Sequence, residues 1–131
     1  MLSDPELEKL LQDRMKRLSA QSTVGSIVRL TKSNFDSYVN GERPVFIDFW
    51  AEWCGPCRAM EPVVANLARR YSGEIVFGKL DIDAEPDIAT RYDVLSIPTF
   101  MIFKSGNPQD TIIGAVGVKA LEKAIEKSLG S

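Results

Sequence analysis

The chain has 131 residues, enough for one domain with a single core and too few for two ordinary domains. Apolar residues make up 44% of it, charged residues 26%, and the net charge is −2, which is typical of a soluble globular protein and does not favour nucleic acid as a partner. The absence of histidine excludes Ser–His and Cys–His catalysis, and two cysteines are too few for a zinc centre, so we expect no bound metal. No apolar stretch approaches the roughly 18 residues of a membrane-spanning helix, so we expect no membrane partner.

Residues 1–25 predict an amphipathic helix followed by a linker. Ser3 or Asp4 can cap the helix, apolar residues then recur at helical spacing, and residues 19–25 are polar and flexible. A short isolated helix is marginally stable in water, so its apolar side needs a cover. The helix could pack on its own domain, pair with a second copy or wait for a partner. We expect a monomer, with a dimer through this helix as the alternative.

The first residues also bear on the location of the protein. They lead into alternating charges and lack the hydrophobic segment of a secretory signal. We therefore expect a cytoplasmic, reducing location. In such a compartment a pair of cysteines is more often redox-active than structural.

From Ser26 onward, predicted strands and helices alternate. Strands are expected at residues 27–30, 44–50, 75–83, 99–103 and 111–113, with residues 104–108 as the turn of a final hairpin. Helices are expected from Ser33 to Tyr38, from the cysteines to near Gly73, from Pro86 to Tyr92, and through Leu121, Ile125 and Leu129. Strands separated by helices imply parallel pairing, and the hairpin adds antiparallel neighbours. Residues 26–131 are therefore predicted to form an α/β domain with a mixed sheet covered by helices.

Cys54 and Cys57 lie where the apolar strand 44–50 passes into a helix. The free N–H groups and the dipole at a helix start favour the thiolate of Cys54, the attacking species in disulfide exchange. The spacing of three places both sulfurs on one side of the first turn, where Gly55 permits close approach and Pro56 costs little. The alternative is a structural disulfide, but a loop of about four residues stabilises by only about 2 kcal/mol. The context therefore favours redox chemistry.

The segment Asp-Phe-Trp-Ala-Glu-Trp-Cys-Gly-Pro-Cys, residues 48–57, resembles the active-site segment of the thioredoxin family at nearly every position. Further matches at the family's spacing are Pro62, residues 79–83, residues 96–99 and residues 114–115. The resemblance covers roughly residues 26–130 and implies the thioredoxin fold, with helices on both faces of a central mixed sheet. Leu95-Ser96 departs from the Arg-Gly often found before the proline, which bears on the choice of partner and not on the chemistry.

The resemblance also implies roles for residues near the cysteines. Asp48 would lie beneath the disulfide and help to move a proton to or from Cys57, with Lys79 as its charged neighbour; burial would raise the pKa of its carboxyl. Trp53 would shield the site and touch partners, whereas Trp50 would support the active-site loop from inside. The competing interpretations are an ordinary strand aspartate and simple core packing of the tryptophans.

A proline segment completes the predicted site. About one X–Pro bond in twenty is cis in folded proteins, so Ile97-Pro98 alone predicts a trans bond. The family match reverses this expectation and implies a cis proline against the disulfide, with the Ile97 backbone turned toward an incoming extended peptide. Gly114, otherwise a turn glycine, would let a partner approach closely. The predicted substrate-contacting residues are Trp53, Gly55, Pro56, Ile97, Pro98 and Gly114.

Four further residues receive no catalytic role. Pro62 is predicted to kink its helix, because proline removes one backbone hydrogen bond. Glu52, Arg58 and Lys104 are predicted to be solvated charges.

The predicted function is reduction of protein disulfides. The Cys54 thiolate attacks a substrate disulfide, and Cys57, deprotonated with help from Asp48, then resolves the mixed disulfide. The resemblance implies that the protein binds no cofactor and that a flavin-dependent thioredoxin reductase recycles the oxidised pair. The expected partners are that reductase and disulfide-containing proteins.

Two other functions stay open at this point. Oxidising or isomerising relatives usually carry His inside the C-x-x-C motif; Pro56 stands there, so we expect a reducing potential near about −270 mV. A redox-independent binding module that docks through the N-terminal helix is the other alternative. A double Cys→Ser variant that kept all cellular function would indicate the binding module.

Overall fold

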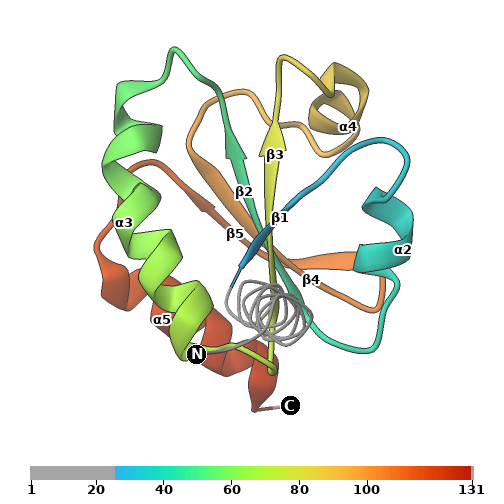
Figure 1. Ribbon diagram of the computed structural model, residues 1–131, viewed down its shortest axis with the longest axis vertical. Coiled ribbons are helices and arrows are strands. Elements are labelled where there is room, and N and C mark those ends of the chain that lie inside the picture. The colour runs from blue at the N-terminus through green and yellow to red at the C-terminus, as the bar shows by residue number, and fades with distance from the viewer. Residues whose placement is uncertain (1–25, 131) are drawn as a thin grey trace, which may run out of the picture.

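The computed structural model describes residues 26–130, in which helices lie on both sides of a central sheet (Figure 1). The strands are β1 (Ile27–Arg29), β2 (Val45–Trp50), β3 (Val76–Asp81), β4 (Thr99–Lys104) and β5 (Asn107–Ile113). The helices are α2 (Phe35–Val39), α3 (Gly55–Arg70), α4 (Pro86–Arg91) and α5 (Val118–Leu129). The helix and linker predicted for residues 1–25 lie outside the described residues.

The strands pair in the order β1-β3-β2-β4-β5. β3 runs parallel to both β1 and β2, whereas β4 runs antiparallel to β2 and β5. The predicted mixed sheet is thus confirmed. β2 lies at the centre, and its first five residues are buried, which explains its almost continuous apolar sequence.

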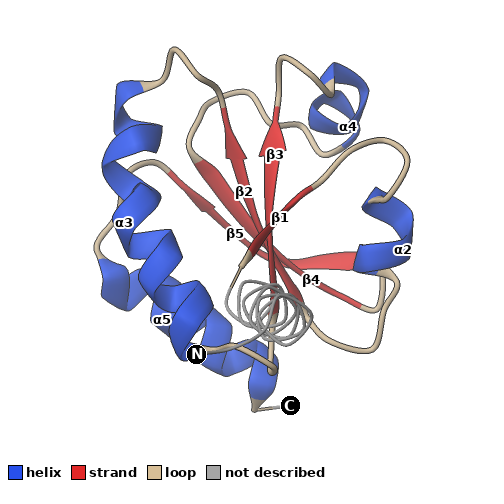
Figure 2. Ribbon diagram, in the orientation of Figure 1, coloured by secondary structure: helices blue, strands red, loops and turns tan. Residues whose placement is uncertain are grey.

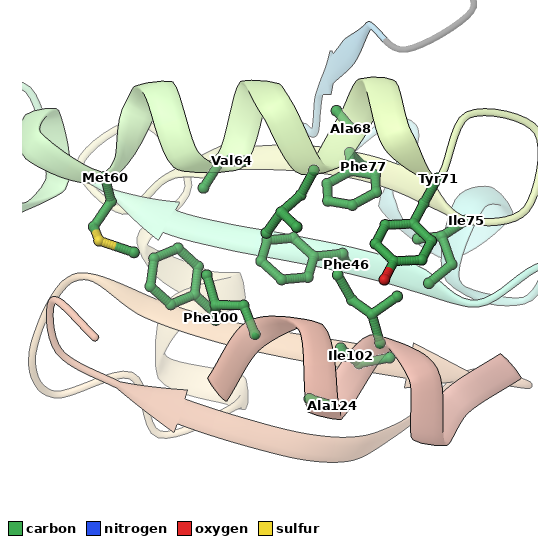
Figure 3. Close-up of a cluster of buried hydrophobic side chains, with 13 residues drawn as sticks. Phe46, Met60, Val64, Ala68, Tyr71, Ile75, Phe77, Phe100, Ile102 and Ala124 are labelled. Carbon is green, nitrogen blue, oxygen red and sulfur yellow. The ribbon is translucent and has the colours of Figure 1, made fainter. Parts of the chain in front are cut away.

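Two layers of helices cover the sheet (Figure 2): α3 and α5 lie on one face, α2 and α4 on the other. Each layer encloses its own cluster of buried apolar side chains. The cluster under α3 and α5 is rich in aromatic residues from three strands, and Figure 3 shows it in close-up; they are Phe46, Phe77 and Phe100. Burying each such side chain stabilises the fold by roughly 1.5–3 kcal/mol.

The alternation of β2 decides which residues lie beneath α3. Val45, Ile47 and Phe49 belong to the cluster under α2 and α4, whereas Phe46 packs with α3 and α5. Because side chains alternate along a strand, Asp48 is on the same face as Phe46. The strand therefore carries a carboxyl toward α3, the helix that begins at the cysteines.

The start of α2 differs from the prediction. The helix begins at Phe35 and no side chain caps it, so the predicted cap at Ser33 is wrong. Asn34 instead binds the preceding loop: its side-chain oxygen accepts from the Thr31 N–H at 2.7 Å, and its amide donates to the Arg29 carbonyl at 3.0 Å. These bonds hold the connection between β1 and α2.

The hairpin between β4 and β5 is tighter than predicted. β5 begins at Asn107, and the turn consists of Ser105 and Gly106, whose φ angles are 54° and 83°. Two left-handed residues match the twist of a two-residue hairpin. Pro108 is tolerated inside β5 because this strand lies at the sheet edge and the register shifts nearby.

Lys104, at the end of β4, is not simply solvated as predicted. Its ammonium donates to the backbone carbonyl of Ser128 at 3.0 Å, near the C-terminal end of α5. The last carbonyls of a helix lack helical partners and favour a cation. The side chain therefore ties α5 to the sheet.

Candidate active site

Cys54 and Cys57 form a disulfide at the start of α3, with their Cα atoms 5.3 Å apart. Cys54 is the N-cap residue, and its sulfur accepts a hydrogen bond from the Cys57 N–H at 3.2 Å. Gly55 and Pro56 fill the first two helical positions, as the motif predicted. Since unpaired N–H groups and the positive end of the helix dipole face the Cys54 sulfur, this position stabilises a thiolate once the disulfide opens.

The disulfide lies in a small apolar cluster of its own. Both cysteines are buried; Cys54 is 4% exposed and Cys57 2%. They pack with Ala51, and three partly buried side chains lie against this group: Trp50, Ile82 and Ile97. Trp50 therefore packs against the buried cysteines.

Arg58 binds the active-site loop. Its guanidinium donates to the backbone carbonyl of Glu52 at 2.6 Å, so the prediction of a merely solvated charge is wrong. The Cys54 N–H donates to the Ala51 carbonyl at 3.1 Å. Together these bonds fix the turn that connects β2 to α3.

Trp53 stands over the site with 68% of its surface exposed. Its indole N–H donates to the carboxylate of Asp83 at 2.8 Å, which anchors the ring although most of it faces solvent. The Asp83 N–H in turn donates to the Asp81 carboxylate at 2.9 Å. Sequence reasoning assigned Asp83 no role, although it closes the matched segment 79–83. The only signal was its place in that segment.

The Ile97–Pro98 peptide bond is cis, as the resemblance implied. Pro98 is buried, and its carbonyl accepts a hydrogen bond from the Gly114 N–H at 2.8 Å. Gly114 has a φ of 96°, which disfavours any side chain, and the space beside its Cα is open. Since Ile97 packs against the cysteines, the structure brings Ile97, Pro98 and Gly114 together beside the disulfide.

Asp48 is the buried carboxyl of the site. It is 1% exposed, and its Oδ1 atom has no hydrogen-bond partner among the described residues. Burial raises its pKa from 3.8 to about 7, since the charged form loses hydration; Lys79 opposes this rise, and Glu61 adds to it. The carboxyl therefore changes its protonation state near neutral pH.

Lys79 lies directly opposite Asp48 in the β2–β3 register, as expected of a charged neighbour. Its ammonium, however, forms its ion pair with Glu61 of α3, at 3.4 Å. Asp48, Glu61 and Lys79 line one surface cavity of about 210 Å³ together with three apolar residues, Ile27, Val64 and Ala65. Sequence reasoning missed Glu61, because nothing in the linear pattern shows which strand lies beneath this side of α3.

No group of three or more acidic or cysteine side chains among residues 26–130 is arranged to hold a metal ion. The helices of the same range are also too short or too polar to cross a membrane.

A disulfide at a helix start, with a buried carboxyl on the strand face beneath that helix, is typical of the class of thiol–disulfide oxidoreductases. The family model that matches is "Thioredoxin", over residues 26–127. The chain is 43% identical to thioredoxin M2, chloroplastic, of Arabidopsis thaliana, covering 98% of this chain and 73% of that protein. It is 46% identical to a thioredoxin of Porphyra purpurea, covering 78% of this chain and 96% of that protein.

A solved structure agrees with these sequence matches. The N21Q mutant thioredoxin from Halobacterium salinarum NRC-1 superposes with a TM-score of 0.75 at 29% identity, covering 82% of this chain and 94% of that one. The chain belongs to the thioredoxin family. It is a protein-disulfide reductase whose redox centre is the Cys54–Cys57 pair.

Proposed function

We propose that Cys54 is the nucleophile and Cys57 the resolving thiol. The Cys54 thiolate attacks one sulfur of a substrate disulfide, that bond breaks, and the released substrate thiolate takes up a proton. Cys57 then attacks the Cys54 sulfur, which frees the second substrate thiolate and leaves the protein oxidised. The position of Cys54 as the N-cap of α3 supports this order, and it is the observation on which the proposal depends.

Asp48 is proposed to exchange the proton of Cys57. A carboxyl with a pKa of about 7 is present in both forms at neutral pH, so it can accept the Cys57 proton before the resolving step. When a reductase reopens the disulfide by attack on Cys54, Asp48 returns the proton to the Cys57 thiolate. Asp48 and Cys57 are both buried, and the alternation of β2 puts Asp48 on the sheet face that α3 covers, which supports this role.

Substrates are proposed to bind over the disulfide. The proposed contact residues are Trp53, Gly55, Pro56, Ile97, Pro98 and Gly114. Trp53 is exposed, Ile97 packs against the cysteines, and the Gly114 N–H donates to the Pro98 carbonyl, which supports a continuous contact surface. Leu95, 94% exposed just before this loop, adds an apolar side chain where a basic residue is often found in the family. We therefore propose that this protein prefers cystines flanked by apolar residues.

The trapping experiment tests the proposed order of attack. A Cys57→Ser variant, immobilised and exposed to cell extract, should retain proteins through mixed disulfides to Cys54 that dithiothreitol releases. Cys54→Ser is the matched control and should retain none. If the Cys54→Ser variant instead retained the adducts, Cys57 would be the nucleophile.

Electrons are proposed to come from a flavin-dependent thioredoxin reductase, and the protein itself is proposed to bind no cofactor. Membership of the family supports a reductase and substrate proteins as partners. Purified protein should reduce insulin with NADPH and such a reductase, and show no flavin or metal signal in its own spectrum. If the protein reduced insulin when dithiothreitol was the electron donor, but no flavin-dependent thioredoxin reductase could replace dithiothreitol, this electron source would be contradicted.

Residues 1–25 are proposed to form a helical extension and linker, separate from a thioredoxin domain at residues 26–131, in a monomeric, cytoplasmic protein. The family match begins at residue 26, which supports this division. A version starting near Ser22 should keep the redox activity and the mass of a monomer. Loss of activity in the shortened version would contradict the proposed separation of the two segments. Fractionation of the protein outside the cytoplasm would contradict the proposed location.

A further inference from the structure

Glu61 lies one helical turn after Cys57 in α3. Residues four apart occupy the same side of a helix, so Glu61 lies on the same side of α3 as Cys57. The Glu61 carboxylate lies 3.4 Å from the Lys79 ammonium, which belongs to β3. The pair therefore connects the catalytic helix to the strand beside Asp48.

Two contacts hold the Lys79 ammonium in place. Glu61 is one, and the ring of Trp50 is the other, with its centroid 4.1 Å from the nitrogen. Lys79 lies directly across the β2–β3 register from Asp48, so an ammonium freed from Glu61 could turn toward that carboxyl. Glu61 and Lys79 both line the cavity that reaches Asp48.

The charges around Asp48 come from three elements. β3 contributes Lys79, and β1 contributes Arg29, which lies opposite Lys79 in the register. α3 contributes Glu61, whereas β4 places an apolar side chain, Phe100, opposite Asp48. β3 also contributes Asp81, which lies two residues after Lys79 on the same face and opposite Trp50 in the register. Glu61 is the acidic side chain that pairs with Lys79 and lines the Asp48 cavity.

We propose that Glu61 is a positioning residue for proton transfer. It holds the Lys79 ammonium beside the Asp48 cavity. This keeps the Asp48 carboxyl able both to accept and to donate a proton at neutral pH. This inference rests on the proposed proton role of Asp48. The ion pair contributes little to stability, because the Glu61 side chain is 50% exposed and solvent screens it. The ion pair acts instead on the electrostatic surroundings of the Asp48 carboxyl.

The direction of the effect follows from the charges. Glu61 raises the pKa of Asp48 and Lys79 lowers it. Without Glu61, the carboxyl stays ionised to lower pH. It then supplies a proton less readily when a reductase thiolate attacks Cys54, the Cys54–Cys57 bond breaks, and the Cys57 thiolate must be protonated.

The test is the carboxyl titration of Asp48 in the oxidised protein, followed by carbon-13 NMR. In Glu61→Gln the midpoint should fall by roughly half a pH unit or more, and in Glu61→Lys it should fall further. Glu122→Gln is the matched control: its ion pair with Arg70, at 3.1 Å, also links α3 to another element but does not line the Asp48 cavity. That variant should titrate like the wild type.

The same substitution in a Lys79→Gln protein shows whether Glu61 acts by positioning Lys79 or through its own charge on Asp48. In Lys79→Gln, the further change Glu61→Gln should lower the midpoint by less than half as much as it does with Lys79 present. An equal fall in both backgrounds, or no fall in Glu61→Gln, would overturn the proposal. Failure of the proposed role of Asp48 would give a different result from failure of the proposed role of Glu61. If Asp48 exchanges no proton with Cys57, Asp48→Asn will leave the pH profile of insulin reduction unchanged, whatever the carboxyl titration shows.

Discussion

The two faces of the sheet are built from the same strands and differ in what those strands place beneath the helices. Under α2 and α4 the buried strand residues are apolar; they are Val45, Ile47, Phe49, Leu80, Met101 and Phe103. Under α3 and α5, one row across the sheet is apolar and the next carries charge. The apolar row is Ile27, Phe77, Phe46 and Ile102, and the next row is Arg29, Lys79, Asp48 and Phe100.

This difference separates stability from chemistry within one small domain. A buried carboxyl with an unpartnered oxygen is costly, and among residues 26–130 Asp48 is the one such side chain, two residues before the end of β2. The uninterrupted apolar cluster on the opposite face offsets this cost. Because side chains alternate along each strand, the same strands supply both the reactive face and the stabilising face of the sheet.

The largest effect is expected from removing the resolving thiol on the reactive face. Cys57→Ser should lower catalysed insulin reduction by about three orders of magnitude or more, because the mixed disulfide cannot be resolved. The unfolding midpoint of the variant should match that of reduced wild type. Turnover within tenfold of the wild type would break the assignment of chemistry to this face.

A substitution on the opposite face should change the free energy of unfolding and leave the redox chemistry unchanged. Phe49→Ala removes a fully buried ring and should cost about 3–5 kcal/mol in urea unfolding. The pH profile of insulin reduction by the folded variant should stay unchanged. Ile113→Ala is the control, because that apolar side chain is exposed on β5 and its loss should cost less than about 0.5 kcal/mol.

Asp48 should make the reactive face sensitive to pH. Its pKa is raised from 3.8 to about 7 in the fold, so its contribution to stability is fully present below pH 3.8 and is lost as the pH rises toward 7. Asp48→Asn removes this titration. Between pH 5 and pH 8 the wild type should therefore lose about 2–3 kcal/mol relative to the variant, both with the disulfide intact.

The comparison at the two pH values contains its own control, because the other carboxyls are present in both proteins and their contributions cancel to first order. A constant difference between wild type and Asp48→Asn from pH 5 to pH 8 would show that the buried carboxyl does not titrate in this range. The contrast between the two faces would then be one of packing only.

The smallest effect is expected at the surface of the reactive face. Asp83→Ala removes the acceptor of the Trp53 indole N–H, a net contribution of roughly 1 kcal/mol, so kcat/KM for insulin should fall by about two- to tenfold. Asp87→Ala is the control, since its contact with Lys32 is exposed and remote from Trp53. Equal values for both variants would show that the indole needs no anchor.

The sequence predicted most of this site because the motif is local. The strand, the turn with Cys54 and Cys57, and the following helix are contiguous, so spacing and capping rules apply to them directly. The cis bond at Pro98 is different. Its dipeptide predicts the opposite isomer, and only the resemblance to a family supplied the correct one.

What the sequence could not predict depends on register between distant segments. Glu61 and Lys79 are 18 residues apart, and their contact follows from the parallel pairing of β2 with β3 beneath α3. The bond from Trp53 to Asp83 spans 30 residues in the same way. The early start of β5 was missed because Pro108 usually opposes a strand, and only its edge position permits one.

Activation of the Cys54 sulfur by the start of α3 can be measured through the ultraviolet thiolate absorbance of the reduced protein as a function of pH. A first ionisation is expected more than one pH unit below the value of about 8.5 for free cysteine, absent in Cys54→Ser and retained in Cys57→Ser. If the first ionisation occurred at or above about pH 8.5, or persisted unchanged in Cys54→Ser, the helix start would not be what activates the sulfur.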